Sequence, residues 1–335
     1  MGPCRVAHRA AATIAPVLEV LLITFPFFAL VLAGFVAAER GMLPLSAIPG
    51  LNGFVLFFAL PALLYRFGAS TPIAHLVDPA VFGIWLLCAA LMVFAVVTTS
   101  RGPRIGWNDA AFGALVATLP NTGFMGVPLL VALFGDSAAG TAIITIVVDL
   151  LFTSSLCIAL SQLGGNSGAT RAAGRALRGV VVNPLPWAVI AGGIVSATGI
   201  QPWAPIRQTI DLLAEAASPV ALFTIGAVLA RSRMLARQED SGSMETADYL
   251  PLVFVKLVMH PLLVLCVGVF AIHLGAPLSH FALTIMVLVA ALPAASNVAI
   301  LSERFGADTG RIARIILLTT AAAFLTFSGA VALFR

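Results

Sequence analysis

The stretch that decides the fold reads Leu119-Pro120-Asn121-Thr122-Gly123-Phe124-Met125-Gly126-Val127-Pro128. It places two prolines, two glycines and an asparagine inside an otherwise apolar segment. Within a bilayer each unpaired backbone group costs several kcal/mol, so an interrupted helix persists only where protein or a water-filled cavity supplies hydrogen-bond partners. The stretch therefore predicts a broken helix that lines a site.

The composition around this stretch is that of a membrane protein. Of the 335 residues, 60% are hydrophobic and 10% are charged, and the mean hydropathy is +1.07. Soluble domains carry about 25% charged residues. At roughly 20 residues per helix, the length allows about ten spans. The alternation of apolar and polar residues that marks a transmembrane β-barrel is absent from the sequence, so we expect an all-α polytopic membrane protein.

Apolar runs between charged clusters and Gly/Pro turns predict ten spans in two groups of five. The first group, residues 1–163, holds spans near 17–38, 48–67, 79–98, 109–134 and 138–163. A glycine- and arginine-containing segment, 164–183, is predicted to be a linker. The second group, residues 184–335, holds spans near 184–200, 209–230, 249–273, 280–304 and 311–333. The N-terminal apolar run is too long for a signal peptide, so we expect it to be the first span.

The arginines predict the orientation of the chain in the membrane. With ten spans, twelve arginines fall on one side and five on the other. The positive-inside rule makes the richer side cytoplasmic, which puts both termini outside and the 164–183 linker inside. The basic charge of +4 is thus explained by topology, and no nucleic-acid partner is needed to account for it.

An internal repeat links the two groups. Ala117-Thr118-Leu119-Pro120 through Phe134-Gly135 in the fourth span matches Ala290-Ala291-Leu292-Pro293 through Phe305-Gly306 in the ninth. The offset is 173 residues at the prolines (120 to 293) and 171 at the Phe-Gly pairs (134 to 305). Because five is odd, the second group runs through the membrane in the opposite sense. This is the inverted repeat of secondary transporters, in which corresponding broken helices mark the binding site.

Both breaks are predicted to lie near the middle of the bilayer. Pro120 and Pro293 lie about 17 to 20 Å along their spans at 1.5 Å per residue. The two spans enter from opposite sides, so their interruptions can cross and turn half-helix ends toward a common cavity. Free N–H groups and the positive end of the helix dipole suit a carboxylate or another anion.

The predicted substrate-binding residues surround these breaks. Asparagine amides and Thr or Ser hydroxyls can donate hydrogen bonds, and glycines let a ligand or another backbone approach closely. The alternative is that the prolines only kink the helices and the small polar residues pack without touching substrate. Two matched breaks favour the binding site. The candidates are Pro120, Asn121, Thr122, Gly123, Gly126, Pro293, Ser296 and Asn297.

Ionisable residues inside spans are the second kind of candidate, because a charge at the bilayer centre costs about 2.5 to 3.5 kcal/mol on insertion scales. Asp149 is the deepest acid and could bind a coupling proton or cation. Lys256 and His260 are four residues apart and share a helix face. Alternatively, Lys256 extends its amine to the cytoplasmic surface and His260 hydrogen-bonds within the bundle. We hypothesise that Asp149 and Lys256 pair in one conformation and separate in another.

No motif in the sequence predicts an enzyme. HExxH, Gly-x-Ser-x-Gly and phosphate-binding loops are absent. The four cysteines are scattered, so we expect neither a disulfide framework nor a metal site. A Walker motif is absent, which argues against an ATP-driven pump. We therefore expect no cofactor beyond a coupling proton or sodium ion.

At these motifs the sequence resembles the auxin efflux carrier family, which includes plant auxin carriers and bacterial malonate and malate permeases. The resemblance runs along essentially the whole membrane region. The matching segments are Phe54 to Pro61, Asn121 to Pro128, Ser218 to Leu222 with Ile225-Gly226, Lys256 to Pro261, and Leu292 to Asn297 with Phe305-Gly306.

The resemblance implies a ten-helix inverted repeat with a scaffold part and a transport part, crossed proline-broken helices and elevator-type alternating access. It implies an anionic, usually carboxylate, substrate near Pro120, Asn121, Pro293 and Asn297, and a homodimer. Two departures point to a bacterial-type permease rather than an auxin carrier. The ninth span lacks glycines equivalent to Gly123 and Gly126, and the linker is short.

We therefore expect a permease of a mono- or dicarboxylate such as malonate or malate, in a bacterial inner membrane. The alternatives are a cation/proton antiporter of similar architecture and a membrane sensor or assembly component that binds a carboxylate without transport.

Overall fold

The computed structural model describes residues 22–71, 78–163, 184–238 and 245–334. Every regular element within these ranges is a helix, which confirms the predicted all-α class. Seven of the described helices are long and apolar enough to cross a membrane: Leu22–Glu39, Leu45–Ser70, Pro79–Ser100, Ser137–Ser161, Ala204–Arg231, Thr246–His273 and Thr309–Phe334. Thr122–Phe134, Pro184–Thr198 and His280–Ala291 are shorter apolar helices. The predicted linker 164–183 and the start of the predicted span 17–38 lie outside the described ranges.

Several of the long helices are built from shorter pieces. After the first helix, Leu22–Glu39, the first half contains η1 (Leu45–Ala47), α2 (Ile48–Phe54), η2 (Val55–Ala59), α3 (Leu60–Ser70), α5 (Pro79–Ser100), α6 (Trp107–Thr118), η3 (Thr122–Gly126), α7 (Val127–Phe134), α8 (Ser137–Val148), η4 (Asp149–Thr153) and α9 (Ser154–Ser161). The second half contains α11 (Pro184–Thr198), α12 (Ala204–Gln238), η5 (Thr246–Asp248), α13 (Leu250–Phe254), η6 (Val255–Met259), α14 (His260–His273), α15 (His280–Ala291), α16 (Asn297–Arg304) and α17 (Thr309–Phe334).

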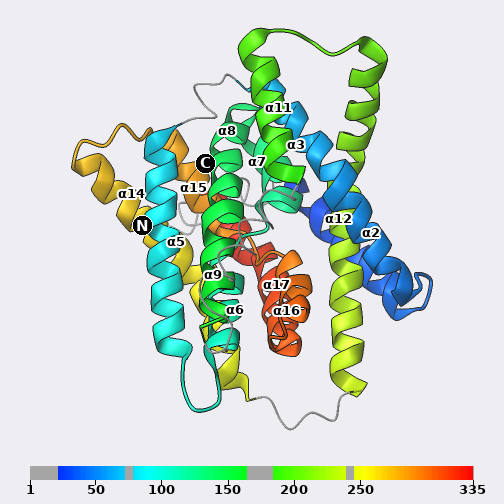
Figure 1. Cartoon of the computed structure of the whole chain (residues 1–335), viewed down its shortest axis with the longest axis vertical. Helices are drawn as coiled ribbons and strands as arrows, with labels where there is room; N and C mark the ends of the chain where they lie inside the picture. The colour runs from blue at the N-terminus through cyan, green and yellow to red at the C-terminus, as the bar shows by residue number, and fades with distance from the viewer. Residues whose placement is uncertain (1–21, 72–77, 164–183, 239–244, 335) are drawn as a thin grey trace, which may run out of the picture.

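The helices pack in two groups, which Figure 1 shows side by side. In one group α3 lies against α11 and α12, and α12 also contacts α2 and η2. In the other group α5 packs on α6, α8 and α14, while α15 packs on α8, α14 and α17. The groups meet where α12 contacts η3 and α17 and where α3 contacts α8. One continuous apolar core runs through both groups.

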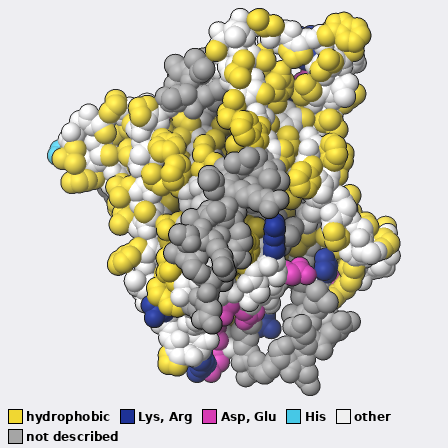
Figure 2. Space-filling model, viewed as in Figure 1, with side chains coloured by type: hydrophobic (Ala, Val, Ile, Leu, Met, Phe, Trp, Pro, Cys, Tyr) yellow, Lys and Arg dark blue, Asp and Glu magenta, His cyan; other side chains and the backbone are white. Residues whose placement is uncertain are grey.

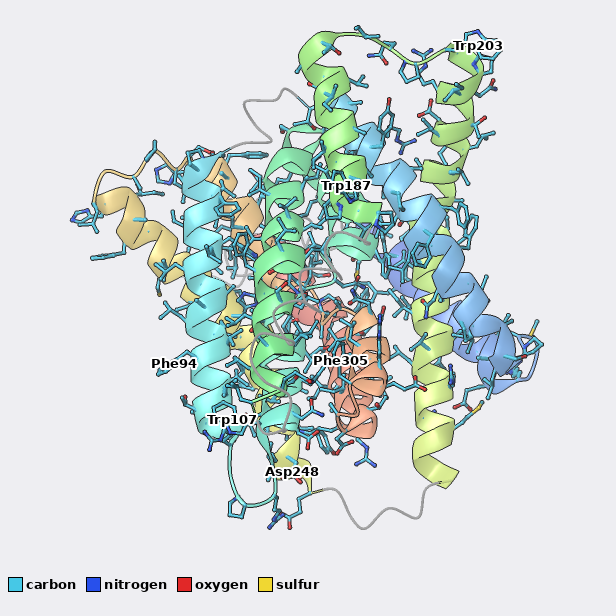
Figure 3. The ribbon with its side chains drawn as sticks, in the orientation of Figure 1. Phe94, Trp107, Trp187, Trp203, Asp248 and Phe305 are labelled. Carbon is cyan, nitrogen blue, oxygen red and sulfur yellow. The ribbon has the colours of Figure 1, made fainter. Side chains whose placement is uncertain are left out.

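Apolar side chains cover much of the visible face, and charged side chains gather mainly toward its lower end (Figure 2). The connection from α5 to α6, the residues just before η5 and the connection from α16 to α17 lie toward one end of the molecule. Arg104 forms a salt bridge of 2.8 Å with Glu245 there, and the Asp308 N–H donates to Asp109 Oδ1 at 2.8 Å. Figure 3 shows Asp248 toward the same end. We call this end the inner end.

Prolines explain three of the four π-helical turns. In η2, η3 and η6 a proline follows two residues after the turn: Pro61, Pro128 and Pro261. Proline has no N–H and its ring clashes with the carbonyl four residues earlier, so the helix widens. Accordingly, the residue before each proline donates its N–H to the carbonyl five residues earlier. In η4, which has no such proline, both the N–H and the hydroxyl of Ser154 bond to the Asp149 carbonyl.

Glycines bring the helices of the first group into backbone contact. A Cβ at Gly34 of the first helix would collide with the Phe223 carbonyl of α12, and a Cβ at Gly226 would collide with the Val31 carbonyl. A Cβ at Gly192 of α11 would likewise collide with the Tyr65 carbonyl of α3. These backbones can approach so closely only because the glycines have no side chain.

We expect Gly226→Ala to destabilise the protein by about 1–3 kcal/mol, because its methyl group would push apart two backbones that cannot repack. The measurement is the apparent Tm of the purified protein in detergent. Gly329→Ala is the matched control, since a Cβ at Gly329 in α17 meets no atom within 4 Å. Equal Tm values for the two variants would contradict the close contact.

Candidate functional site

The two predicted breaks lie side by side in the structure. Helix α6 ends at Thr118 and the chain becomes helical again at η3, while α15 ends at Ala291 and α16 begins at Asn297. The Asn121 N–H donates to the Pro293 carbonyl at 2.9 Å, and the Ala295 N–H donates to the Leu119 carbonyl at 3.0 Å. These bonds form an isolated antiparallel bridge between Pro120 and Ala294. Each break therefore supplies hydrogen-bond partners for the other.

The residue before each proline determines where each helix stops. Leu119 has φ −78° and ψ 108°, and Leu292 has φ −62° and ψ 155°. Both are extended because the ring of a following proline disfavours helical geometry at the residue before it. A third bond supports the second break, since the Ala294 N–H donates to Thr319 Oγ1 of α17 at 3.3 Å. Thr319 was not among the predicted site residues, because its role depends on how α17 packs.

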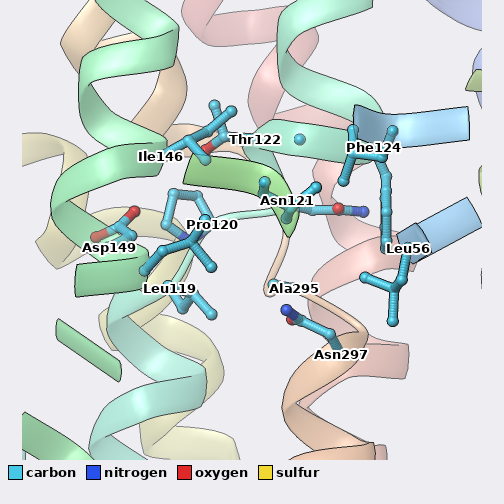
Figure 4. A pocket seen from close by; sticks show the side chains of 14 residues that line it. Leu56, Leu119, Pro120, Asn121, Thr122, Phe124, Ile146, Asp149, Ala295 and Asn297 are labelled. Atoms are coloured by element: carbon cyan, nitrogen blue, oxygen red, sulfur yellow. The ribbon is translucent and has the colours of Figure 1, made fainter. Parts of the chain in front are cut away.

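A pocket opens beside the bridge (Figure 4). Its polar lining includes Asn121, Thr122, Asp149 and Asn297, and the remaining lining residues are apolar or glycine. The full lining is Leu56, Leu60, Leu119, Pro120, Asn121, Thr122, Gly123, Phe124, Ile146, Asp149, Leu150, Leu185, Ala295 and Asn297. Residues from both helix groups thus form its wall.

Several polar groups of this pocket have no partner among the described residues. Thr122 Oγ1 and Asn297 Oδ1 are buried and make no hydrogen bond there. Asn121 is only 4% exposed, and its side-chain amide makes no hydrogen bond to the described part of the chain. Buried polar groups are normally paired, so unpaired ones at a pocket indicate room for a ligand or water.

The predicted substrate-binding residues divide into two sets. Pro120, Asn121, Thr122, Gly123 and Asn297 line the pocket. The other three lie behind it. Gly126 faces the Leu292 side chain, Pro293 accepts the bond from Asn121, and Ser296 precedes α16. Direct contact between these three and a substrate stays a prediction.

Asp149 joins the pocket to a buried polar network. It is 3% exposed, and its Oδ1 accepts hydrogen bonds from Trp85 Nε1 at 3.1 Å and from Thr153 Oγ1 at 3.0 Å. Our sequence reasoning missed both donors. Thr153 could have been found, because it is four residues after Asp149 on the same helix face. Trp85 gave a weaker signal, namely that a buried indole N–H usually finds an acceptor.

The network continues through the two other coupling candidates. The Trp85 and His260 rings lie 5.5 Å apart, and His260 Nδ1 lies 3.1 Å from Lys256 Nζ. The Lys256 amine also donates to the Ala290 carbonyl at 3.2 Å. Lys256 is 0% exposed, so the alternative that its amine reaches the cytoplasmic surface is wrong. The position of Lys256 in the sequence predicted its depth in the span but not the direction of its side chain, which points into the bundle.

Asp149 and Lys256 do not form a salt bridge in this conformation, because the carboxylate is bound by Trp85 and Thr153 and the amine by His260 and Ala290. No group of three or more His, Cys, Asp or Glu side chains suited to a metal ion occurs in the described part of the chain.

Comparisons with known proteins identify relatives among membrane transporters. The family model described as "Membrane transport protein" matches residues 16–331. A Rhizobium meliloti (strain 1021) protein named "Putative malonate transporter" is 28% identical over 95% of this chain and 96% of its own length. "Uncharacterized transporter YfdV" of Escherichia coli (strain K12) is 27% identical over 85% of this chain and 88% of its own. "Auxin efflux carrier component 8" of Arabidopsis thaliana is 24% identical over 82% of this chain and 86% of its own.

The apolar helices and these matches make the chain a multi-pass membrane protein. The matched relatives include auxin efflux carriers, as the motifs of the sequence indicated. The chain therefore belongs to the membrane transport protein family, the family of the auxin efflux carriers.

Proposed function

We propose that this protein is a secondary transporter of a small organic anion, a mono- or dicarboxylate such as malonate or malate, by elevator-type alternating access. One observation carries the proposal. Two helix breaks meet at a pocket where the Asn121 side-chain amide and Asn297 Oδ1 make no hydrogen bond to the described residues. The name of the Rhizobium meliloti relative supports malonate as the first substrate to test.

The chemistry of the pocket supports an anion. The amide nitrogens of Asn121 and Asn297 and the Thr122 hydroxyl can donate hydrogen bonds to a carboxylate. Each hydrogen bond to a charged group contributes about 1.5–3 kcal/mol. The N-terminal end of α16 adds a favourable helix dipole beside Asn297.

Pairs of equivalent contacts support a ten-span 5+5 inverted repeat. Such a repeat relates the first helix to α11 and relates α2 and α3 to α12. The glycine contact of the first helix with α12 then corresponds to that of α11 with α3. The rings of Phe112 and Phe305, 5.9 Å apart, likewise correspond to those of Phe281 and Phe134, 6.5 Å apart.

The location of the pocket supports alternating access by an elevator. Its polar lining comes from the broken segments and η4, whereas Leu56, Leu60 and Leu185 come from the α2–α3 and α11 side. If one helix group moves across the membrane against the other, the pocket opens to each side in turn. The α12 contacts with η3 and α17 lie on the surface that would slide.

Orientation and assembly are further parts of the proposal. Arg101, Arg104, Arg304, Arg311 and Arg314 belong to connections or helix ends at the inner end, which supports a cytoplasmic inner end in a bacterial inner membrane. Both termini are then outside. A homodimer rests on the family resemblance.

We expect Asn121→Ala and Asn297→Ala each to weaken substrate binding about 10- to 100-fold, because each removes a hydrogen bond to a carboxylate. The measurement is the uptake of labelled malonate and malate into proteoliposomes, with and without pH and sodium gradients. Asn52→Ala in α2 is the matched control, since Asn52 does not line the pocket.

Loss of concentrative uptake in both pocket variants but not in the control would support the proposal. Uptake that survives in both would refute the site. If wild-type protein binds carboxylate without transporting it, the result would favour a membrane sensor or assembly component. Ion flux without carboxylate would instead favour the cation/proton antiporter.

Asp149 is the first candidate for binding a coupling proton or sodium ion, with Lys256 and His260 behind it. We expect the double variant Asp149→Asn/Lys256→Met to transport better than either single variant, because each single change leaves one buried charge without its opposite. Initial uptake rates per folded molecule test this. A double variant no better than the singles would refute pairing during the cycle.

A further inference from the structure

A buried arginine joins several helix ends at the inner end. Arg311, in the first turn of α17, is 3% exposed. Its Nε donates to the Asp248 carbonyl at 2.8 Å and its Nη1 donates to the Asp109 carbonyl at 3.0 Å. These carbonyls belong to η5, just before α13, and to the first turn of α6. Since a buried charge must be paired, the guanidinium requires both segments to stay in place.

Further bonds complete this junction. Asp308 Oδ1 accepts from the Arg311 N–H at 2.9 Å, and the Asp308 N–H donates to Asp109 Oδ1 at 2.8 Å. Asn108 Nδ2 donates to the Phe305 carbonyl at 3.0 Å. We call Asn108, Asp109, Asp248, Asp308 and Arg311 the inner clamp. Gly113 makes room for it, because a Cβ there would lie 3.2 Å from Arg311 Nη1.

The inner clamp fastens the two half-helices that lead to the pocket. Helix α6 runs from the clamp to Thr118, and α16 runs from Asn297 back to the clamp. At 1.5 Å per residue, the clamp lies about 18 Å from the break along α6 and about 12 Å along α16. The Phe112 and Phe305 rings pack 5.9 Å apart near the clamp.

Two junctions are needed to fix the angle between α6 and α16. The backbone bridge at Pro120 and Ala294 joins the half-helices at the pocket but leaves the angle between them free to change. A second junction at their far ends sets that angle. At the opposite end, α7 and α15 are joined by the Phe134 and Phe281 rings, and no hydrogen bond links their outer ends within the described ranges.

We propose that Arg311 is a positioning residue for the pocket. Its side chain ties the start of α17, which follows α16 in the chain, to α6 and η5. This keeps α6 and α16 at one angle, and thereby holds Asn121 and Asn297 at the separation at which they bind the same ligand. Arg311 does not line the pocket and acts only through the two half-helices. The ligand-binding consequence rests on the proposed function, whereas the geometric consequence does not.

The first test reports the separation directly and needs no substrate. In full-length protein whose four cysteines are replaced by alanine, Asn121→Cys and Asn297→Cys are cross-linked with bifunctional methanethiosulfonates of graded length. We expect one preferred spacer length in this parent. Arg311→Gln should spread the reaction over several lengths, and Gly113→Ala, which displaces the guanidinium, should do the same.

Arg314→Gln is the matched control, because Arg314 lies one turn along α17 and stacks on Tyr249 at 5.8 Å without joining the clamp. It should react as the parent does. If both Arg311→Gln and Gly113→Ala cross-link like the parent, the proposal is overturned. Gly113→Ala keeps the test valid even where Arg311→Gln does not fold.

The second test uses malonate uptake by variants with native asparagines. Arg311→Gln should raise KM about tenfold, as expected for one weakened hydrogen bond to a charged ligand, while Vmax per folded molecule stays within about twofold. A merely structural role would lower the folded amount and leave KM unchanged. If wild-type protein takes up no carboxylate, the proposed function fails while the cross-linking still decides the role of Arg311.

Discussion

The requirement that every backbone polar group be paired in hydrocarbon governs this structure. Two hydrogen bonds, from Asn121 to Pro293 and from Ala295 to Leu119, allow two helices to stop inside the membrane. Neither break could satisfy its own backbone, so each depends on the other. The pocket exists because two segments of the chain, after α6 and after α15, depart from helical geometry at one point. The candidate pocket and a fold that tolerates two broken helices are thus the same arrangement.

All four π-helical turns contribute residues to the pocket or to its polar network. Three of the π-helical turns contribute Leu56, Gly123 and Asp149 to the pocket wall, and the fourth contains Lys256. Widened turns of this kind are often found at functional sites. Proline accounts for three of these turns. Its missing N–H and its ring often end a helix, but here they widen the helix and reorient side chains while the helix continues.

Local rules in the sequence predicted the helix breaks of the backbone, but they predicted few of the side-chain contacts. Proline chemistry and the matched repeat located both breaks, and the depth of Asp149 in an apolar run singled it out. The same reasoning could not give the lateral direction of Lys256, which decides whether its amine meets solvent or His260. It also could not reveal Trp85 and Thr319, whose partners come from helices 64 and 25 residues away in the sequence.

The π-helical turns also have a consequence for comparing relatives. A π-turn accommodates one residue more than an α-turn while the helix continues, so it is a place where a membrane helix can gain or lose a residue without losing its span. A one-residue gap in an alignment within 55–59, 122–126, 149–153 or 255–259 would therefore be a genuine structural difference. Removing the extra residue would rotate everything beyond it by about 100° at 3.6 residues per turn, and a different set of side chains would face the pocket.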